Sequence, residues 1–179
     1  MPTVHHNPIV LPFGPVDIVP EEQRALTLMD APQVLPGVVD SSGWREGPVE
    51  ATHELCEILR SRCELRGSHE HLFLLLYFDQ VIEQLHSGAT LRSALLPLPN
   101  AKFSLTGEAF VTADFAFWTG RHFVTVFIRE SRFDRHWFRE ERLLKTWGFE
   151  VFQLMAEQLE TRGLSGDIGE KILEALRFG

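Results

Sequence analysis

Cysteine is scarce in this sequence of 179 residues, where Cys56 and Cys63 are the only two. So few thiols exclude a disulfide scaffold. On a helix the two would lie two turns apart on one face, with α-carbons about 10 Å apart, which is too far for a disulfide. They do not form a Cys-x-x-Cys pair, so we interpret both as small core residues rather than redox groups.

Long apolar stretches are absent as well. The longest run, residues 72–78, is far shorter than the roughly 18 apolar residues that a membrane-spanning helix needs. Residues 1–10 show no basic flank followed by an apolar block, so no signal peptide is predicted. These features predict a cytoplasmic protein with no membrane partner.

Several motifs of catalysis and metal binding are also missing. The sequence has no glycine-rich phosphate loop, no Gly-x-Ser-x-Gly elbow and no His-Glu-x-x-His motif. Its eight histidines do not cluster, and His69 and His71 are spaced so that they would not face each other on a helix. A structural zinc site is therefore not predicted.

The charge is acidic overall but uneven. There are 17 basic and 25 acidic residues, a net charge of −8, which disfavours nucleic-acid binding by the surface as a whole. Residues 121–145 nevertheless carry seven basic and four acidic side chains. A local basic face on an acidic protein is therefore compatible with the sequence.

Proline separates an N-terminal arm, residues 1–48, from a domain formed by residues 49–179. Seven of the ten prolines lie before residue 40, which predicts an extended or turning chain with at most a short helix after Pro20. The arm is too apolar for a free tail. We expect it to pack on the core or on a partner subunit, and a homodimer is one possibility that this leaves open.

The domain is predicted to be α/β, with a mixed central sheet flanked by helices. Apolar spacing predicts helices over residues 49–66 and 68–86, the second opened by Ser68, and Pro97 and Pro99 mark a break. Aromatic and β-branched residues then predict strands over 103–105, 109–118 and 122–129. A helix over 132–147, a strand over 149–153 and one or two terminal helices follow, so that a hairpin precedes a strand–helix–strand crossover.

One segment carries a family resemblance. Asp114 lies in an apolar strand, residues 143–151 read as a helix ending in a Gly-aromatic pair and a short strand, and Glu70 lies early in the helix before the sheet. This pattern resembles the core of the PD-(D/E)XK nuclease superfamily, the restriction-endonuclease-like fold. Members place an aspartate on one strand and Glu-x-Lys at the end of the next, followed by a helix and a short strand.

The resemblance implies a metal-dependent phosphodiesterase. Two carboxylates on adjacent strands would bind one or two Mg²⁺ ions, which generate hydroxide and stabilise the charge that develops on the phosphate. If the protein acts on DNA or RNA in this way, Asp114 would hold the metal together with Glu70 or Glu130. Arg129 would stand in for the lysine of the family.

The same residues depart from the family pattern. Counting across the hairpin from Asp114 places Phe127 where the second carboxylate belongs and Arg129 where the lysine belongs. A phenyl ring cannot bind Mg²⁺, and arginine is a poor substitute for a lysine that orients water. Glu130 would point to the opposite face of a regular strand. We therefore predict a nuclease-like protein with a degenerate active site, acting in or derived from DNA processing or defence.

Three site predictions have simpler alternatives. Asp114 could pair with an arginine such as Arg129, and Glu70 could only stabilise a helix N-terminus. A basic stripe on the helix over 132–147 could contact a nucleic-acid backbone, or be a solvated face paired with glutamates. The stripe comprises Arg132, Arg135, Arg139 and Arg142. Without an aromatic platform on the same face, single-strand binding is not implied.

Two other functions remain open. The first is a non-catalytic domain for protein–protein interaction or oligomerisation, in which the sheet and the apolar arm serve assembly. The second is a small-molecule binding domain that uses the aromatic hairpin of residues 115–127. A second carboxylate within about 4–5 Å of Asp114 would favour the nuclease, since two ligands must share one metal.

Overall fold

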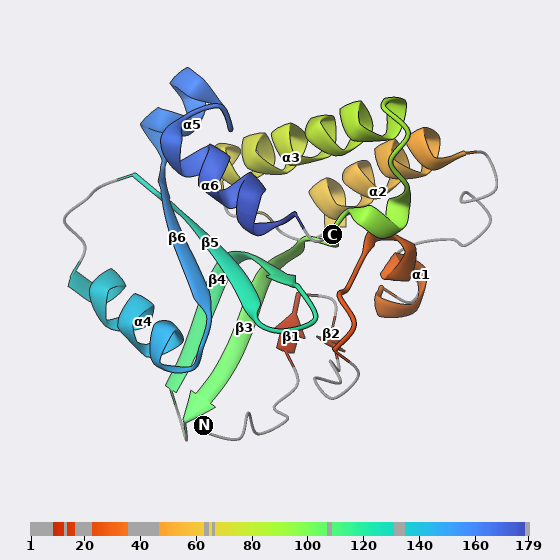
Figure 1. Cartoon of the computed structure of the whole chain (residues 1–179). Coiled ribbons are helices and arrows are strands. Elements are labelled where there is room, and N and C mark those ends of the chain that lie inside the picture. Colours follow the sequence, from red (N-terminus) through yellow and green to blue (C-terminus); the bar gives the residue numbers. More distant parts are fainter. Residues whose placement is uncertain are drawn as a thin grey trace.

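The computed structural model describes residues 9–12, 14–16, 23–35, 47–62, 65, 67–106, 109–130 and 135–177. It is a mixed α/β arrangement in which helices flank a six-stranded sheet, as Figure 1 shows. Within these described ranges, no helix has both the length and the apolar character required to cross a membrane.

The sheet has the strand order β2-β1-β3-β4-β5-β6. Strands β5 and β6 are parallel, and every other neighbouring pair is antiparallel. The parallel pair needs a crossover, which helix α4 (Arg135–Thr146) provides. The strands are β1 (Ile9–Leu11), β2 (Gly14–Val16), β3 (Leu98–Thr106), β4 (Ala109–Trp118), β5 (Phe123–Arg129) and β6 (Glu150–Met155).

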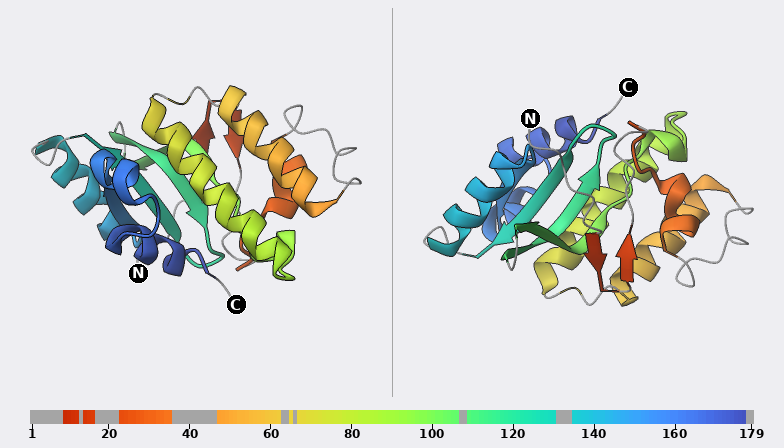
Figure 2. Two further views of the ribbon diagram at one scale, coloured as in Figure 1. Left: turned by 90° about the horizontal axis from the view of Figure 1, so that it is seen from above. Right: turned by 90° about the horizontal axis from the view of Figure 1, so that it is seen from below.

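The helices lie on both sides of this sheet. Figures 1 and 2 show α2 and α3 crossing one face, with α5 and α6 on the same side near β6, and α4 beside β5 and β6 on the other side. The long helices are α2 (Pro48–Arg62), α3 (Ser68–His86), α4 (Arg135–Thr146), α5 (Ala156–Arg162) and α6 (Asp167–Ala175). Short helical turns occur at η2 (Leu28–Asp30), α1 (Ala31–Val34) and η4 (Leu91–Ser93).

The core forms where α3 packs on the hairpin of β4 and β5. The ring of Phe73 lies 4.7 Å from that of Phe115, and the ring of Tyr77 lies 5.2 Å from that of Phe117. Tyr77 also donates a 2.6 Å hydrogen bond to the carbonyl of Leu95, and burial raises the pKa of its hydroxyl far above the usual range. The apolar run at 72–78 is therefore the part of α3 that packs against the sheet.

The described part of the N-terminal arm belongs to this core. Strands β1 and β2 extend the sheet at its edge, and Leu28 is fully buried. The amide of Leu26 donates to the carbonyl of Trp118 at 3.0 Å, which fixes the arm beside the end of β4. This close approach requires Gly120, where an added Cβ would lie 2.7 Å from the carbonyl oxygen of Gln23.

Most predicted elements are found, with shifted ends. The expected helix over 49–66 is α2, the expected helix over 68–86 is α3, and its N-cap is Gly67 rather than Ser68. The helix that was expected after Pro20 is absent from residues 23–26, and helical turns begin only at Leu28. The last strand is β6, which extends two residues beyond the predicted end at 153.

The break predicted at Pro97 and Pro99 is confirmed at Pro97, which lies between η4 and β3, and is wrong at Pro99, because β3 begins at Leu98 and includes Pro99. Pro99 pairs with Phe115 of β4, while β1 pairs with β3 further along, at Lys102. A proline is tolerated at a strand position where no neighbour requires its missing N–H. The prediction that the cysteines are small core residues is confirmed for Cys56, which is buried. Cys63 lies outside the described residues.

Candidate functional site

Asp114 lies where strands β4 and β5 cease to pair through their backbones. The register runs from Trp118 opposite Phe123 to Phe115 opposite Val126. One residue further, the Asp114 carboxylate accepts a 2.7 Å hydrogen bond from the amide of Ile128. The side chain thus takes the place of a backbone acceptor.

Phe127 is the residue across from Asp114 when this register is extended by one position. Its side chain is only 1% exposed, so it is a core residue, and its ring has no atom that can bind a cation. Within the described ranges, no group of three histidine, cysteine or acidic side chains is arranged to hold a metal ion. The residues present at Asp114 therefore do not fit the Mg²⁺ that the family resemblance implies.

Arg129 joins three elements on the α4 side of the sheet. Its Nε donates to Oε1 of Gln153 on β6 at 3.3 Å, and its terminal nitrogen lies 3.5 Å from the carboxylate of Glu140 on α4. The guanidinium also lies 4.9 Å from the centre of the Phe127 ring. Arg129 therefore holds α4 against β5 and β6 through its polar contacts with Gln153 and Glu140.

Glu130 points to the other side of the sheet. Its carboxylate lies 4.0 Å from Nδ1 of His69, at the start of α3, and Nε2 of the same histidine lies 2.5 Å from a carboxylate oxygen of Glu160 on α5. The alternation of side chains along β5 accounts for this, since Arg129 faces α4. Glu130 is 85% exposed and is not brought to the Asp114 side of the sheet.

Glu70 lies in the first turn of α3 and folds back on the helix start. One carboxylate oxygen lies 2.9 Å from the point where a Cβ on Gly67, the N-cap residue, would be. A carboxylate in this place stabilises the unpaired amides of a helix N-terminus. The structure thus places Glu70 in the first turn of α3, where a carboxylate favours the helix N-terminus.

The basic stripe can be described in part. Arg132 lies outside the described residues, and Arg135 begins α4 but its side chain is not described. Arg139 and Arg142 are exposed, and neither forms an ion pair within the part of the chain that the structure covers. The neighbouring acids are engaged elsewhere, because Glu140 contacts Arg129 and Glu141 contacts Lys145.

Sequence reasoning missed Phe138, which lies on this surface and is 60% exposed. Its ring is 4.2 Å from that of Trp137, and it lines a shallow groove of about 540 Å³ together with Arg142 and Lys145. The spacing of four between Phe138 and Arg142 places them on neighbouring turns of one helix face. That spacing was the available signal for an aromatic group beside the basic stripe.

Comparisons of the chain with protein-family models, with curated proteins and with solved structures gave no match.

Proposed function

We propose that this chain is a restriction-endonuclease-like domain that binds nucleic acid without cleaving it. The element order α3-β3-β4-β5-α4-β6, with β5 and β6 parallel, supports the fold part of the proposal. It contains the strand, turn, strand, helix and short strand in the order that the family resemblance implies. Asp114 lies on the second strand of this unit.

The observation that carries the loss of cleavage is that Phe127 lies across from Asp114 when the β4–β5 register, which ends at Phe115 opposite Val126, is extended by one position. A shared metal needs a second carboxylate near the first, and Phe127 cannot supply one. Asp114 instead bonds the amide of Ile128, and Arg129 contacts Gln153 and Glu140. The positions that the family resemblance implies to be catalytic thus hold strands and helix together.

Binding is assigned to the exposed face of α4, defined by Phe138, Arg139 and Arg142. Two guanidinium groups without ion pairs among the described residues suit phosphate oxygens, which they can engage with paired hydrogen bonds. The exposed ring of Phe138 offers a stacking surface for a base. Because Glu140 and Glu141 are engaged by Arg129 and Lys145, their repulsion of a phosphate backbone is reduced.

The test is fluorescence anisotropy of labelled DNA and RNA oligonucleotides with the full chain over a series of salt concentrations. Affinity for nucleic acid falls as salt rises, so the slope of log affinity against log salt is negative. We expect the double variant Arg139→Gln/Arg142→Gln to make this slope shallower by about 1 to 2, since each lost phosphate contact removes nearly one unit. Arg121→Gln is the matched control, because Arg121 is an exposed arginine in the β4–β5 turn. Equal slopes for the wild type and the double variant would exclude α4 as the binding surface.

A second candidate is a protein interface on the open face of β1, β3 and β4. Val10 and Phe110 are exposed there, Val10 pairs with Lys102, and the Lys102 ammonium lies 4.1 Å from the centre of the Phe110 ring. In the view from below in Figure 2, β1 and β2 lie in front of the helices. Sedimentation of the wild type and of Phe110→Ser tests it, and a dimer that dissociates in the variant would favour assembly as the function.

A further inference from the structure

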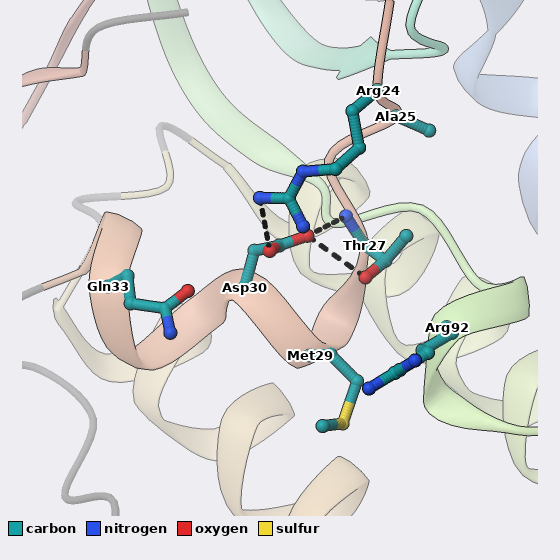
Figure 3. A pocket seen from close by; sticks show the side chains of 7 residues that line it. All are labelled: Arg24, Ala25, Thr27, Met29, Asp30, Gln33 and Arg92. Atoms are coloured by element: carbon teal, nitrogen blue, oxygen red, sulfur yellow. Dashed lines mark hydrogen bonds and ion pairs between the residues drawn. The ribbon is translucent and has the colours of Figure 1, made fainter. Parts of the chain in front are cut away.

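A second hollow, separate from the α4 face, lies between the N-terminal arm and the connection from α3 to β3. It has a volume of about 570 Å³, within the range typical of small-molecule sites. Figure 3 shows Arg24, Thr27 and Asp30 of the arm gathered together, and the side chain of Met29 beside that of Arg92 of η4. Neither the family resemblance nor the proposed function uses these residues.

The frame of this pocket is held by backbone hydrogen bonds. The amide of Leu28 donates to the carbonyl of Ala94 at 3.0 Å, and the amide of Leu96 donates to the carbonyl of Leu26 at 2.9 Å. These bonds join the arm to the segment that follows Arg92. The indole nitrogen of Trp118 also donates to the carbonyl of Arg24 at 3.0 Å. Both walls are therefore attached to the same part of the core.

Asp30 fixes one of the two arginines. Its side chain is only 5% exposed, and one carboxylate oxygen accepts hydrogen bonds from the amide and the hydroxyl of Thr27 at 2.8 and 3.0 Å. The other oxygen lies 2.9 Å from a terminal nitrogen of Arg24, whose own side chain is 65% exposed. Since both oxygens of Asp30 are engaged, the aspartate orients Arg24 and leaves other guanidinium donors for a ligand.

Arg92 adds a second cation from the opposite wall. It is exposed and makes no ion pair with any residue that the structure describes. The pocket therefore holds two guanidinium groups and one carboxylate, an excess of positive charge beside the exposed, apolar side chain of Met29. A small molecule with an anionic group for the guanidinium groups and an apolar part for Met29 matches this pocket.

We propose that this pocket binds the phosphate group of a small phosphate monoester, with Arg24 and Arg92 as its ligands. A phosphate monoester carries a charge of about −1.5 to −2 at neutral pH and three acceptor oxygens. It can therefore engage two guanidinium forks together, whereas a carboxylate has only two oxygens to share between them. The organic part of the ligand lies against Met29. The proposal is independent of nucleic-acid binding by α4.

The test is isothermal titration calorimetry of the full chain with inorganic phosphate and with glycerol phosphate, using acetate as the carboxylate arm. We expect saturable binding of both phosphates at one site. Arg92→Gln should weaken this binding by about tenfold or more, since it removes a charge-assisted contact. Arg121→Gln, which removes an exposed arginine elsewhere, should leave the affinity unchanged.

A second variant, Arg24→Lys, keeps a positive charge beside Asp30 but removes the guanidinium fork, and it should also weaken phosphate binding. The absence of saturable phosphate binding to the wild type would overturn the proposal. So would an equal loss in Arg92→Gln and Arg121→Gln, because that result would mean attraction to general surface charge. Acetate binding as tight as phosphate binding would overturn the choice of phosphate.

Discussion

The backbone amide of Ile128 donates a 2.7 Å hydrogen bond to the carboxylate of Asp114. This bond continues the connection between β4 and β5 beyond the last backbone pair, Phe115 with Val126. An acidic residue that the sequence singled out as a metal ligand is thus a structural acceptor in the fold. The carboxylate thus accepts a hydrogen bond from a backbone amide of the neighbouring strand.

Replacing Asp114 should therefore change stability. We expect Asp114→Ala to lower the free energy of unfolding by about 1–3 kcal/mol, because it leaves the amide of Ile128 without this acceptor. Asp114→Asn keeps a side-chain oxygen in the same place and should lose less. Urea denaturation of the two variants measures the difference. An Asp114→Ala variant with the same free energy of unfolding as the wild type would contradict a structural role for this carboxylate.

Gly120 should be needed for docking of the N-terminal arm. Gly120→Ala would place a Cβ 2.7 Å from the carbonyl oxygen of Gln23 and 2.8 Å from the amide of Ala25, at a φ of +90°. We expect a loss of more than about 1 kcal/mol, measured by thermal or urea unfolding. The matched control is Gly88→Ala, at a φ of +97° with no atom within 4 Å.

The Gly88→Ala control separates the loss of stability caused by backbone strain from the loss caused by a clash with the arm. Both substitutions strain the backbone, but only the one at Gly120 adds a clash with the arm. If Gly88→Ala and Gly120→Ala cost the same free energy, the arm does not lie against the hairpin as described.

Cys56 should make the free energy of unfolding fall at alkaline pH. Burial raises the pKa of its thiol to about 11, above the ordinary value of about 8.5, although the nearby Arg60 acts in the opposite direction. The folded state therefore holds this proton more tightly than the unfolded state does. The stabilisation is present in full below about pH 8.5 and is lost as the pH rises toward 11.

Comparison with Cys56→Ala isolates this thiol. The difference in unfolding free energy between the wild type and the variant should stay constant up to about pH 8.5 and then move against the wild type. Peptide mapping after alkylation at neutral pH should show Cys56 unmodified in the folded chain. Rapid native alkylation at Cys56 would show that the thiol is not buried.

Local patterns in the sequence were enough to predict much of the fold. The spacing of apolar residues predicted α3, and the aromatic and β-branched residues predicted β4 and β5. Alternation along β5 also predicted that Arg129 and Glu130 face opposite sides, which their contacts with Glu140 and His69 confirm. These features depend on residues that are close in the chain.

What the sequence did not predict depends on contacts between distant segments. Pro99 lies inside β3 because β1 pairs elsewhere, at Lys102, and no local rule could show this. The pocket of Arg24 and Arg92 exists because Leu26 and Leu28 pair with residues far along the chain. The exposure of Phe138 is likewise decided by which face of α4 meets the sheet.

The proposal that this chain binds nucleic acid without cleaving it is tested most directly by one incubation that measures binding and cleavage together. Labelled DNA and RNA oligonucleotides are mixed with the wild-type chain and Mg²⁺ or Mn²⁺, and anisotropy is followed by gel analysis of the same samples. We predict salt-sensitive binding with intact oligonucleotides, and the same result for Asp114→Asn. Cleavage that requires the metal and disappears in Asp114→Asn would contradict the claim, because it would show that Asp114 still serves a working nuclease.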